Sequence, residues 1–269
     1  MQRIVRSGSG SGTRSSRVGV RYEVVPRVDA WELPEEPMPE SLIHDQAVEL
    51  LKALLSAWAA RVGSTQVMRN LAVRWDPEHP NVGVDPDVSV FSPPPPRDDA
   101  ADVTSVRTWL EGHAPPILAV EVVSDANPRK DYVIAPDKYA ASGTRELWIF
   151  DPKLAGPTAH GGPFRLQIWS RDEGGDLVRV YAGEGPARSP VLGAYLVVVD
   201  EGHKLRIADD FEATRFWLTT EEAERAAKEA ERAAKEAERA AKEAERAAKE
   251  AALARVKELE ARLAKGAKG

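Results

Sequence analysis

The stretch from residue 85 to residue 152 contains three apolar runs: DPDVSVF (85–91), ILAVEVVS (117–124) and RELWIFDP (145–152). Short apolar runs bounded by proline or glycine are typical of strands buried in a sheet. Between the last two runs, residues 130–142 have a helical pattern, and Gly143 is well placed to end that helix. This alternation of strands and a helix decides the fold class.

Working outward, the remaining sequence adds a helix and several strands. Ser41 precedes a helical apolar pattern that ends near Gly63, and the polar stretch 97–114 is predicted to be a loop. Further strands are predicted at 18–25, 66–75, 164–171, 176–182, 194–199 and 204–208. The order predicts an α/β (α+β) domain with a mixed central sheet flanked by helices.

The composition changes abruptly near residue 219. All 20 prolines of the 269-residue chain precede this point, and residues 220–264 are almost entirely Ala, Glu, Arg and Lys. The heptad EAERAAK occurs four times in 222–249, with Glu224 and Lys228 spaced for a favourable i,i+4 pair. We therefore expect a basic disordered tail at 1–17, a folded domain at 18–212 and a long charged helix at 213–269.

Alanine recurs at the second and fifth positions of each heptad, which is the spacing of a coiled-coil seam. An alanine seam buries little area, so a solitary charged helix remains the alternative. We expect a homodimer or higher oligomer through this helix.

Composition also limits the setting in which the chain works. It contains no cysteine, which excludes disulfides and cysteine-zinc sites and is compatible with a reducing cytoplasm. No apolar run is long enough to span a membrane. The net charge of −6 does not favour nucleic-acid binding, so any contact with DNA must come from local basic patches.

Two carboxylates interrupt the apolar runs. Asp87 follows Pro86 at the head of one predicted strand, and Glu121 lies inside another. A carboxylate among valines and isoleucines is costly to bury unless it is paired or metal-bound. On neighbouring strands both can hold Mg²⁺ or Mn²⁺, which prefer oxygen ligands. Alternatively, Asp87 caps a turn and Glu121 pairs with an arginine such as Arg69 or Arg74.

The succession PDVSV, AVEVVS, KDY and KYAASGTRELWIFDP resembles the Uma-type restriction endonuclease family, part of the PD-(D/E)XK nuclease superfamily. PMPESLIHDQ, which carries His44, is similar to the family's approach to its first helix. The likeness covers about residues 20–200. It implies a restriction-endonuclease-like fold with Asp87 and Glu121 as metal ligands. In the enzyme hypothesis, the Val122 carbonyl is a further candidate ligand.

The lysine expected by the family pattern is absent. Val123 stands where the superfamily name places a lysine, and Ala135 stands where the Uma-type pattern offers one on the following helix. Lys138 lies three residues further along the same helix and is our candidate to orient the attacking water. Lys130 is the reserve candidate, and a solvated surface position is the alternative for both lysines.

Three other polar residues are weaker candidates for the site. Asp131, which matches an acidic position at the family's helix entry, is expected to cap its helix, and a site role is the alternative. His44 is expected to be a hydrogen-bonded residue at a helix start, with a base as the alternative. Glu49 could be a helix-borne acid of the kind that some superfamily members use.

These patterns predict a metal-dependent endonuclease that hydrolyses DNA phosphodiester bonds with a metal-activated water. The alternative is a catalytically silent nuclease-fold module that acts in DNA binding or assembly through its coiled coil.

Overall fold

The computed structural model describes residues 3–4, 20–21, 31–33, 41–96, 104–158 and 162–266. Chain contacts divide it into two compact units, Met1–Thr219 and Thr220–Gly269. The tail expected at 1–17 lies outside the described residues apart from Arg3 and Ile4. In the first unit, residues 216 and 217 still pair with strand β13 (Lys204–Ala208), beyond the domain boundary predicted at residue 212.

The core of the first unit is an eight-stranded mixed sheet in the order β1-β2-β10-β9-β8-β7-β5-β3. Strands β7 and β8 are parallel to each other, and the other neighbouring pairs are antiparallel. The strands are β1 (Arg3–Ile4), β2 (Val20–Arg21), β3 (Gln66–Met68), β5 (Val88–Phe91), β7 (Leu118–Val122), β8 (Glu146–Phe150), β9 (Leu166–Arg171) and β10 (Leu177–Gly183).

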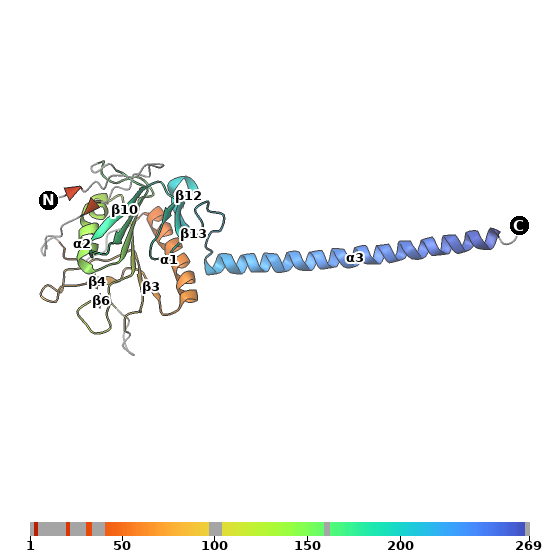
Figure 1. Ribbon diagram of the computed structural model, residues 1–269, viewed down its shortest axis with the longest axis horizontal. Coiled ribbons are helices and arrows are strands. Elements are labelled where there is room, and N and C mark those ends of the chain that lie inside the picture. The colour runs from red at the N-terminus through yellow and green to blue at the C-terminus, as the bar shows by residue number, and fades with distance from the viewer. Residues whose placement is uncertain are drawn as a thin grey trace. The chain divides into compact units, whose positions relative to one another are not determined.

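Helices cover both faces of this sheet (Figure 1). Helix α1 (Leu42–Val62) packs Leu51, Leu54 and Leu55 against one face, together with β12 (Tyr195–Val199) and β13. The other face is covered by the π-helical turn η2 (Lys130–Ile134) and helix α2 (Ala135–Ser142), which connect β7 to β8. Strands β5, β7 and β8 are buried throughout, which explains their nearly continuous apolar sequence.

Two regions differ from the sequence-based expectation. The single strand predicted at 66–75 is split into β3 and β4 (Ala72–Arg74), because Asn70 between them has a φ of 51° and cannot continue a strand. The predicted loop at 97–114 contains β6 (Ser105–Arg107), which pairs in parallel with β4. The remaining short elements are β11 (Ala187–Arg188) and the 3-10 turn η4 (Asp200–Gly202).

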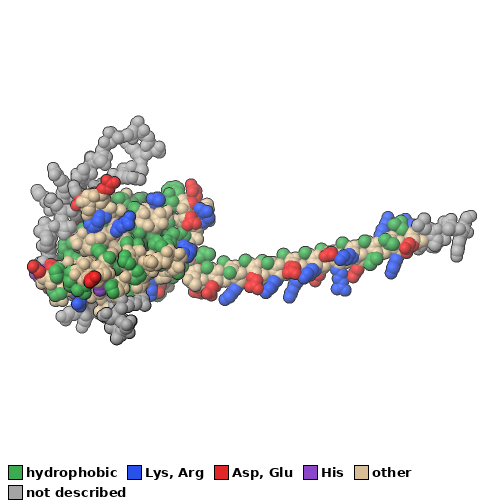
Figure 2. All heavy atoms as spheres, turned by 60° about the horizontal axis from the view of Figure 1, so that its bottom comes forward, with side chains coloured by type: hydrophobic (Ala, Val, Ile, Leu, Met, Phe, Trp, Pro, Cys, Tyr) green, Lys and Arg blue, Asp and Glu red, His purple; other side chains and the backbone are tan. Residues whose placement is uncertain are grey.

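The second unit is the single helix α3 (Thr220–Gly266), 47 residues long. The predicted i,i+4 pairs are confirmed in three successive heptads, as Glu231–Lys235, Glu238–Lys242 and Glu245–Lys249. Lysines and arginines line one side of the helix, and hydrophobic side chains line another (Figure 2). In the part of the chain that the structure describes, no helix has the length and apolar character needed to cross a membrane.

Candidate functional site

Strand pairing places Asp87 beside Glu121. In the antiparallel pair β5–β7, Val88 lies opposite Val120. Continuing that register by one residue sets Asp87, immediately before β5, opposite Glu121. The Asp87 carboxylate Oδ2 accepts a hydrogen bond of 2.7 Å from the Val122 N–H, so the two candidate metal ligands meet at the same end of the strands.

Glu121 is only 1% exposed and lies on the face of β7 that α2 covers. Its neighbours Ala119 and Val123 on that face belong to the apolar core beneath α2, which makes the carboxylate an exception in its surroundings. The Tyr139 hydroxyl donates to Glu121 Oε1 at 2.6 Å. Burial raises the pKa of Glu121 well above its usual range, Lys130 opposes that rise, and Asp87 and Asp131 add to it.

Two lysines approach this carboxylate from η2 and α2. The Lys130 side chain is exposed overall, yet its pKa is raised, chiefly by the charge of Glu121. Lys138 is 8% exposed, and burial lowers its pKa to about 8, with a further lowering from Lys130 and an opposing effect from Glu121. The charges of both lysines therefore interact with the Glu121 carboxylate.

The π-helical turn helps to place the two lysines on one side. In a regular α-helix, positions 130 and 138 would point about 80° apart. Here the Ala135 N–H donates to the Lys130 carbonyl, five residues back. Such a turn holds more residues than an α-helical turn, so it reduces the angle between the two positions. π-Helical turns inside helices are frequent at functional sites.

Asp131 joins the carboxylate cluster, a role that the sequence analysis ranked behind helix capping. It is the second residue of η2, whereas Arg129 is the N-cap and makes no side-chain cap bond, so the expected capping role is wrong. Burial raises the pKa of Asp131 to about 7. Lys130 and a hydrogen bond with the Ser124 backbone lower that pKa, and Asp87 raises it. Its position in a π-helical turn was not apparent from an α-helical pattern.

His44 also reaches the site. It lies in the first turn of α1, where its backbone N–H donates to Ser41 Oγ at 3.4 Å, as expected for a residue at a helix start. Its buried imidazole places Nε2 3.2 Å from Asp87 Oδ2.

The described contacts of Arg69 and Arg74 are made with residues other than Glu121, the partner considered for them. Arg69 binds Asp45 at 2.7 Å and Glu49 at 2.5 Å. Arg74 donates to the Pro80 carbonyl. Glu49 is thus an exposed partner of Arg69 on the surface of α1.

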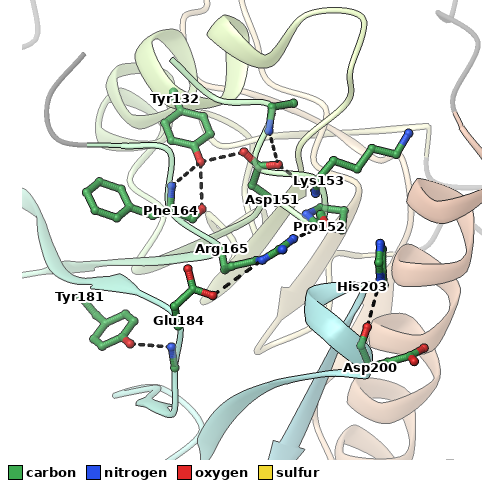
Figure 3. A network of polar contacts seen from close by, with 12 residues as sticks. Tyr132, Asp151, Pro152, Lys153, Phe164, Arg165, Tyr181, Glu184, Asp200 and His203 are labelled. Atoms are coloured by element: carbon green, nitrogen blue, oxygen red, sulfur yellow. Dashed lines mark hydrogen bonds and ion pairs between the residues drawn. The ribbon is translucent and has the colours of Figure 1, made fainter. Parts of the chain in front are cut away.

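A second polar network anchors the turn that carries Asp131 (Figure 3). The Tyr132 hydroxyl lies 2.9 Å from both Asp151 Oδ2 and the Phe164 carbonyl, and it accepts a hydrogen bond from the Phe164 N–H at 3.0 Å. Asp151 also accepts from the Ala155 and Gly156 N–H groups at 3.0 and 2.8 Å. A Cβ at Gly156 would lie 2.2 Å from the Tyr132 ring, so only glycine fits there. The network ties η2 to the loop after β8.

Within the described residues, no group of three or more His, Cys, Asp or Glu side chains is arranged to hold a metal ion. A hard cation such as Mg²⁺ is commonly bound by one or two carboxylates while keeping several waters. Two carboxylates with a neighbouring backbone carbonyl are a set of oxygen donors of this kind.

The chain is similar to a known protein family and to a solved structure. No curated protein sequence matches the chain. A similar solved structure is titled "Crystal structure of a putative nuclease belonging to DUF820 from Anabaena variabilis ATCC 29413 at 1.96 A resolution". It shares 15% sequence identity with a TM-score of 0.41, covering 58% of this chain and 75% of that chain. Residues 32–158, which contain Asp87, Glu121 and both lysines, match the model of the Uma2 family, described as "Putative restriction endonuclease".

Proposed function

We propose that the chain is a metal-dependent endonuclease that hydrolyses phosphodiester bonds in DNA. The observation that carries the proposal is the meeting of Asp87 with the Glu121–Val122 end of β7, where Asp87 Oδ2 bonds to the Val122 N–H. The Uma2 match over residues 32–158 supports a nuclease.

Asp87, Glu121 and the Val122 carbonyl would hold Mg²⁺ or Mn²⁺. The raised pKa of Glu121 supports this assignment, because a bound cation offsets the cost of keeping a buried carboxylate ionised. A divalent ion at this place would supply a water of lowered pKa and neutralise charge that develops on the phosphate.

Lys138 is the group that we assign to the attacking water. Its pKa of about 8 leaves a fraction of the amine neutral near pH 7, so the side chain can orient a water and also accept its proton. The Tyr139 hydroxyl holds Glu121, and the Lys130 charge compensates the surrounding carboxylates.

We also propose that α3 joins two copies of the chain, so that two sites can act on opposite DNA strands. The exposed Leu253, Val256 and Leu259 near the end of α3 supply side chains larger than alanine for such a contact. The cytoplasmic location expected from the cysteine-free composition stays a prediction.

Plasmid cleavage with Mg²⁺, with Mn²⁺ and with a chelator tests the enzyme assignment. We expect wild type to cut only with a metal, and Asp87→Asn and Glu121→Gln, which keep side-chain volume, to fall to the chelator level. Lys138→Met keeps the apolar stem and should lose about 10²- to 10⁴-fold in rate, the usual contribution of general acid–base catalysis. Lys130→Met is its matched comparison.

Equal cleavage by wild type and both carboxylate variants would refute the site. Ala135, where the family pattern has a lysine, favours the silent-module alternative. That alternative is supported if the wild type binds DNA but does not cut it with either metal.

A further inference from the structure

His44 stands at a position where helices often carry a glutamate. Ser41 is the N-cap of α1, and His44 is three residues later, where a capping box places Glu or Gln to reach back to the N-cap backbone. The His44 imidazole instead is 3% exposed and has Nε2 3.2 Å from Asp87 Oδ2. Its side chain therefore connects the start of α1 to the head of β5.

The contacts of Asp87 are unequal between its two oxygens. Oδ2 lies 2.7 Å from the Val122 nitrogen and 3.2 Å from His44 Nε2, while Oδ1 takes part in neither contact. Two donors from separate elements, β7 and α1, fix both the position and the plane of the carboxylate. With one oxygen held in this way, Oδ1 has a defined direction.

We propose that His44 is a positioning residue that holds Asp87 through Oδ2 and so presents Oδ1 to the divalent cation. This inference rests on the proposed function, because it concerns the same metal site. The imidazole donates to the carboxylate through its Nε2–H group. Partners that orient a ligating carboxylate typically contribute 10- to 100-fold to metal affinity.

The test compares two amides at position 44 in the full-length chain. In His44→Gln the amide nitrogen can reach the place of Nε2, whereas in His44→Asn the side chain is one methylene shorter and falls short of Asp87. Mn²⁺ affinity is measured by calorimetry without DNA, and thermal melting confirms that both variants fold. We expect about 10- to 100-fold weaker Mn²⁺ binding by His44→Asn and nearly wild-type binding by His44→Gln.

Cleavage gives a second readout. The Mg²⁺ concentration for half-maximal rate should rise in His44→Asn, while the rate at saturating Mg²⁺ stays near that of wild type. Unchanged Mn²⁺ affinity in both amide variants, or an equal loss in both, overturns the positioning role. If Asp87→Ala also binds Mn²⁺ like wild type, the proposed function fails as well. If Asp87→Ala loses binding and His44→Asn does not, only the role of His44 fails.

Discussion

Glu121 on β7 and Glu146 on β8 are buried carboxylates on adjacent strands, but their surroundings differ. Glu146 accepts hydrogen bonds from Trp148 Nε1 and Ser189 Oγ, both at 2.5 Å, and from the Val191 N–H at 2.7 Å. Burial raises the pKa of both carboxyl groups. Fixed donors satisfy Glu146 as a structural group, whereas within the described residues Glu121 accepts from the Tyr139 hydroxyl and interacts with nearby cationic side chains.

Replacing each glutamate by glutamine separates these roles. Glu121→Gln removes a carboxylate whose ionisation burial disfavours, so we expect equal or higher stability at pH 8 and no stabilisation by added Mn²⁺. In Glu146→Gln the side-chain NH₂ group would face groups that are themselves donors. We therefore expect the free energy of unfolding to fall by about 1–3 kcal/mol. Urea unfolding with and without Mn²⁺ measures both effects. A Glu121→Gln variant that Mn²⁺ still stabilises would argue against the metal site.

Asp131 gives a pH-dependent prediction. Its folded pKa of about 7 lies above the ordinary 3.8, so between these values the folded chain binds a proton that the unfolded chain has lost. Stability therefore falls as pH rises through this window and levels off above pH 7. Asp131→Asn cannot ionise, so its stability gain over wild type should be larger at pH 8 than at pH 5. An equal difference at both values, measured by urea unfolding, would contradict the shift.

At the scale of the element, Arg171 on β9 holds the end of α2. Its guanidinium donates to the carbonyls of Tyr139, Ala140 and Thr144 at 3.2, 2.9 and 3.1 Å. The Tyr139 and Ala140 carbonyls lie in the last turn of α2, where backbone acceptors lack helical partners, and Thr144 follows the helix. Gly143 follows in a left-handed conformation, with a φ of 83°. The arginine therefore fixes the helix that carries Lys138 and Tyr139.

Arg171→Lys tests this contact. A single ammonium cannot span three carbonyls as the planar guanidinium does, so we expect a loss of about 1–3 kcal/mol in stability. Mn²⁺ binding should weaken as well, because Tyr139 orients Glu121. The exposed Arg188→Lys is the matched control, with an expected change within about 0.5 kcal/mol. Similar effects in both variants would count against a specific role for Arg171.

The sequence predicts most of the large elements because their patterns are strong. Helix α1 and strands β7, β8, β9, β12 and β13 are confirmed close to the expected ranges. Short elements were missed where the signal depends on distant partners: β6 needs β4 beside it, and the break at Asn70 is a single left-handed residue. Local periodicity reports burial along one segment and contains no information on such pairing.

The residues of the candidate site likewise fall into those that the sequence reveals and those that it does not. Asp87 and Glu121 are visible in the sequence because each interrupts an apolar strand, and the structure brings them together. Asp131 and Lys130 owe their places to the π-helical turn, which an α-helical pattern does not reveal. Their proposed roles, like that of Lys138, stay predictions.

At the scale of the whole molecule, α3 differs from the first unit in what holds it together. Its ion pairs join residues three or four positions apart, and its described side chains are almost all exposed. Exposed pairs of this kind contribute about 0.3–0.5 kcal/mol each and weaken with salt. The pairing with a second copy that we propose for α3 would add contacts between helices to these local pairs.

Ending the chain after Thr219 tests that pairing. We expect light scattering to report a smaller oligomer than for the full-length chain, with single-strand nicking retained and double-strand cutting reduced. The same first unit with α3 replaced by an unrelated dimeric coiled coil is the control and should restore double-strand cutting. An unchanged oligomeric state after truncation would exclude α3 as the dimer contact.

The distribution of tryptophan offers a way to watch the two units separately. All seven indoles occur at or before residue 217, ahead of α3. Intrinsic fluorescence therefore reports the first unit alone, while far-ultraviolet ellipticity at 222 nm reports both units. On heating, we expect unfolding of α3 to reduce the ellipticity gradually while the tryptophan emission stays constant. The cooperative unfolding of the first unit at higher temperature should then change both signals.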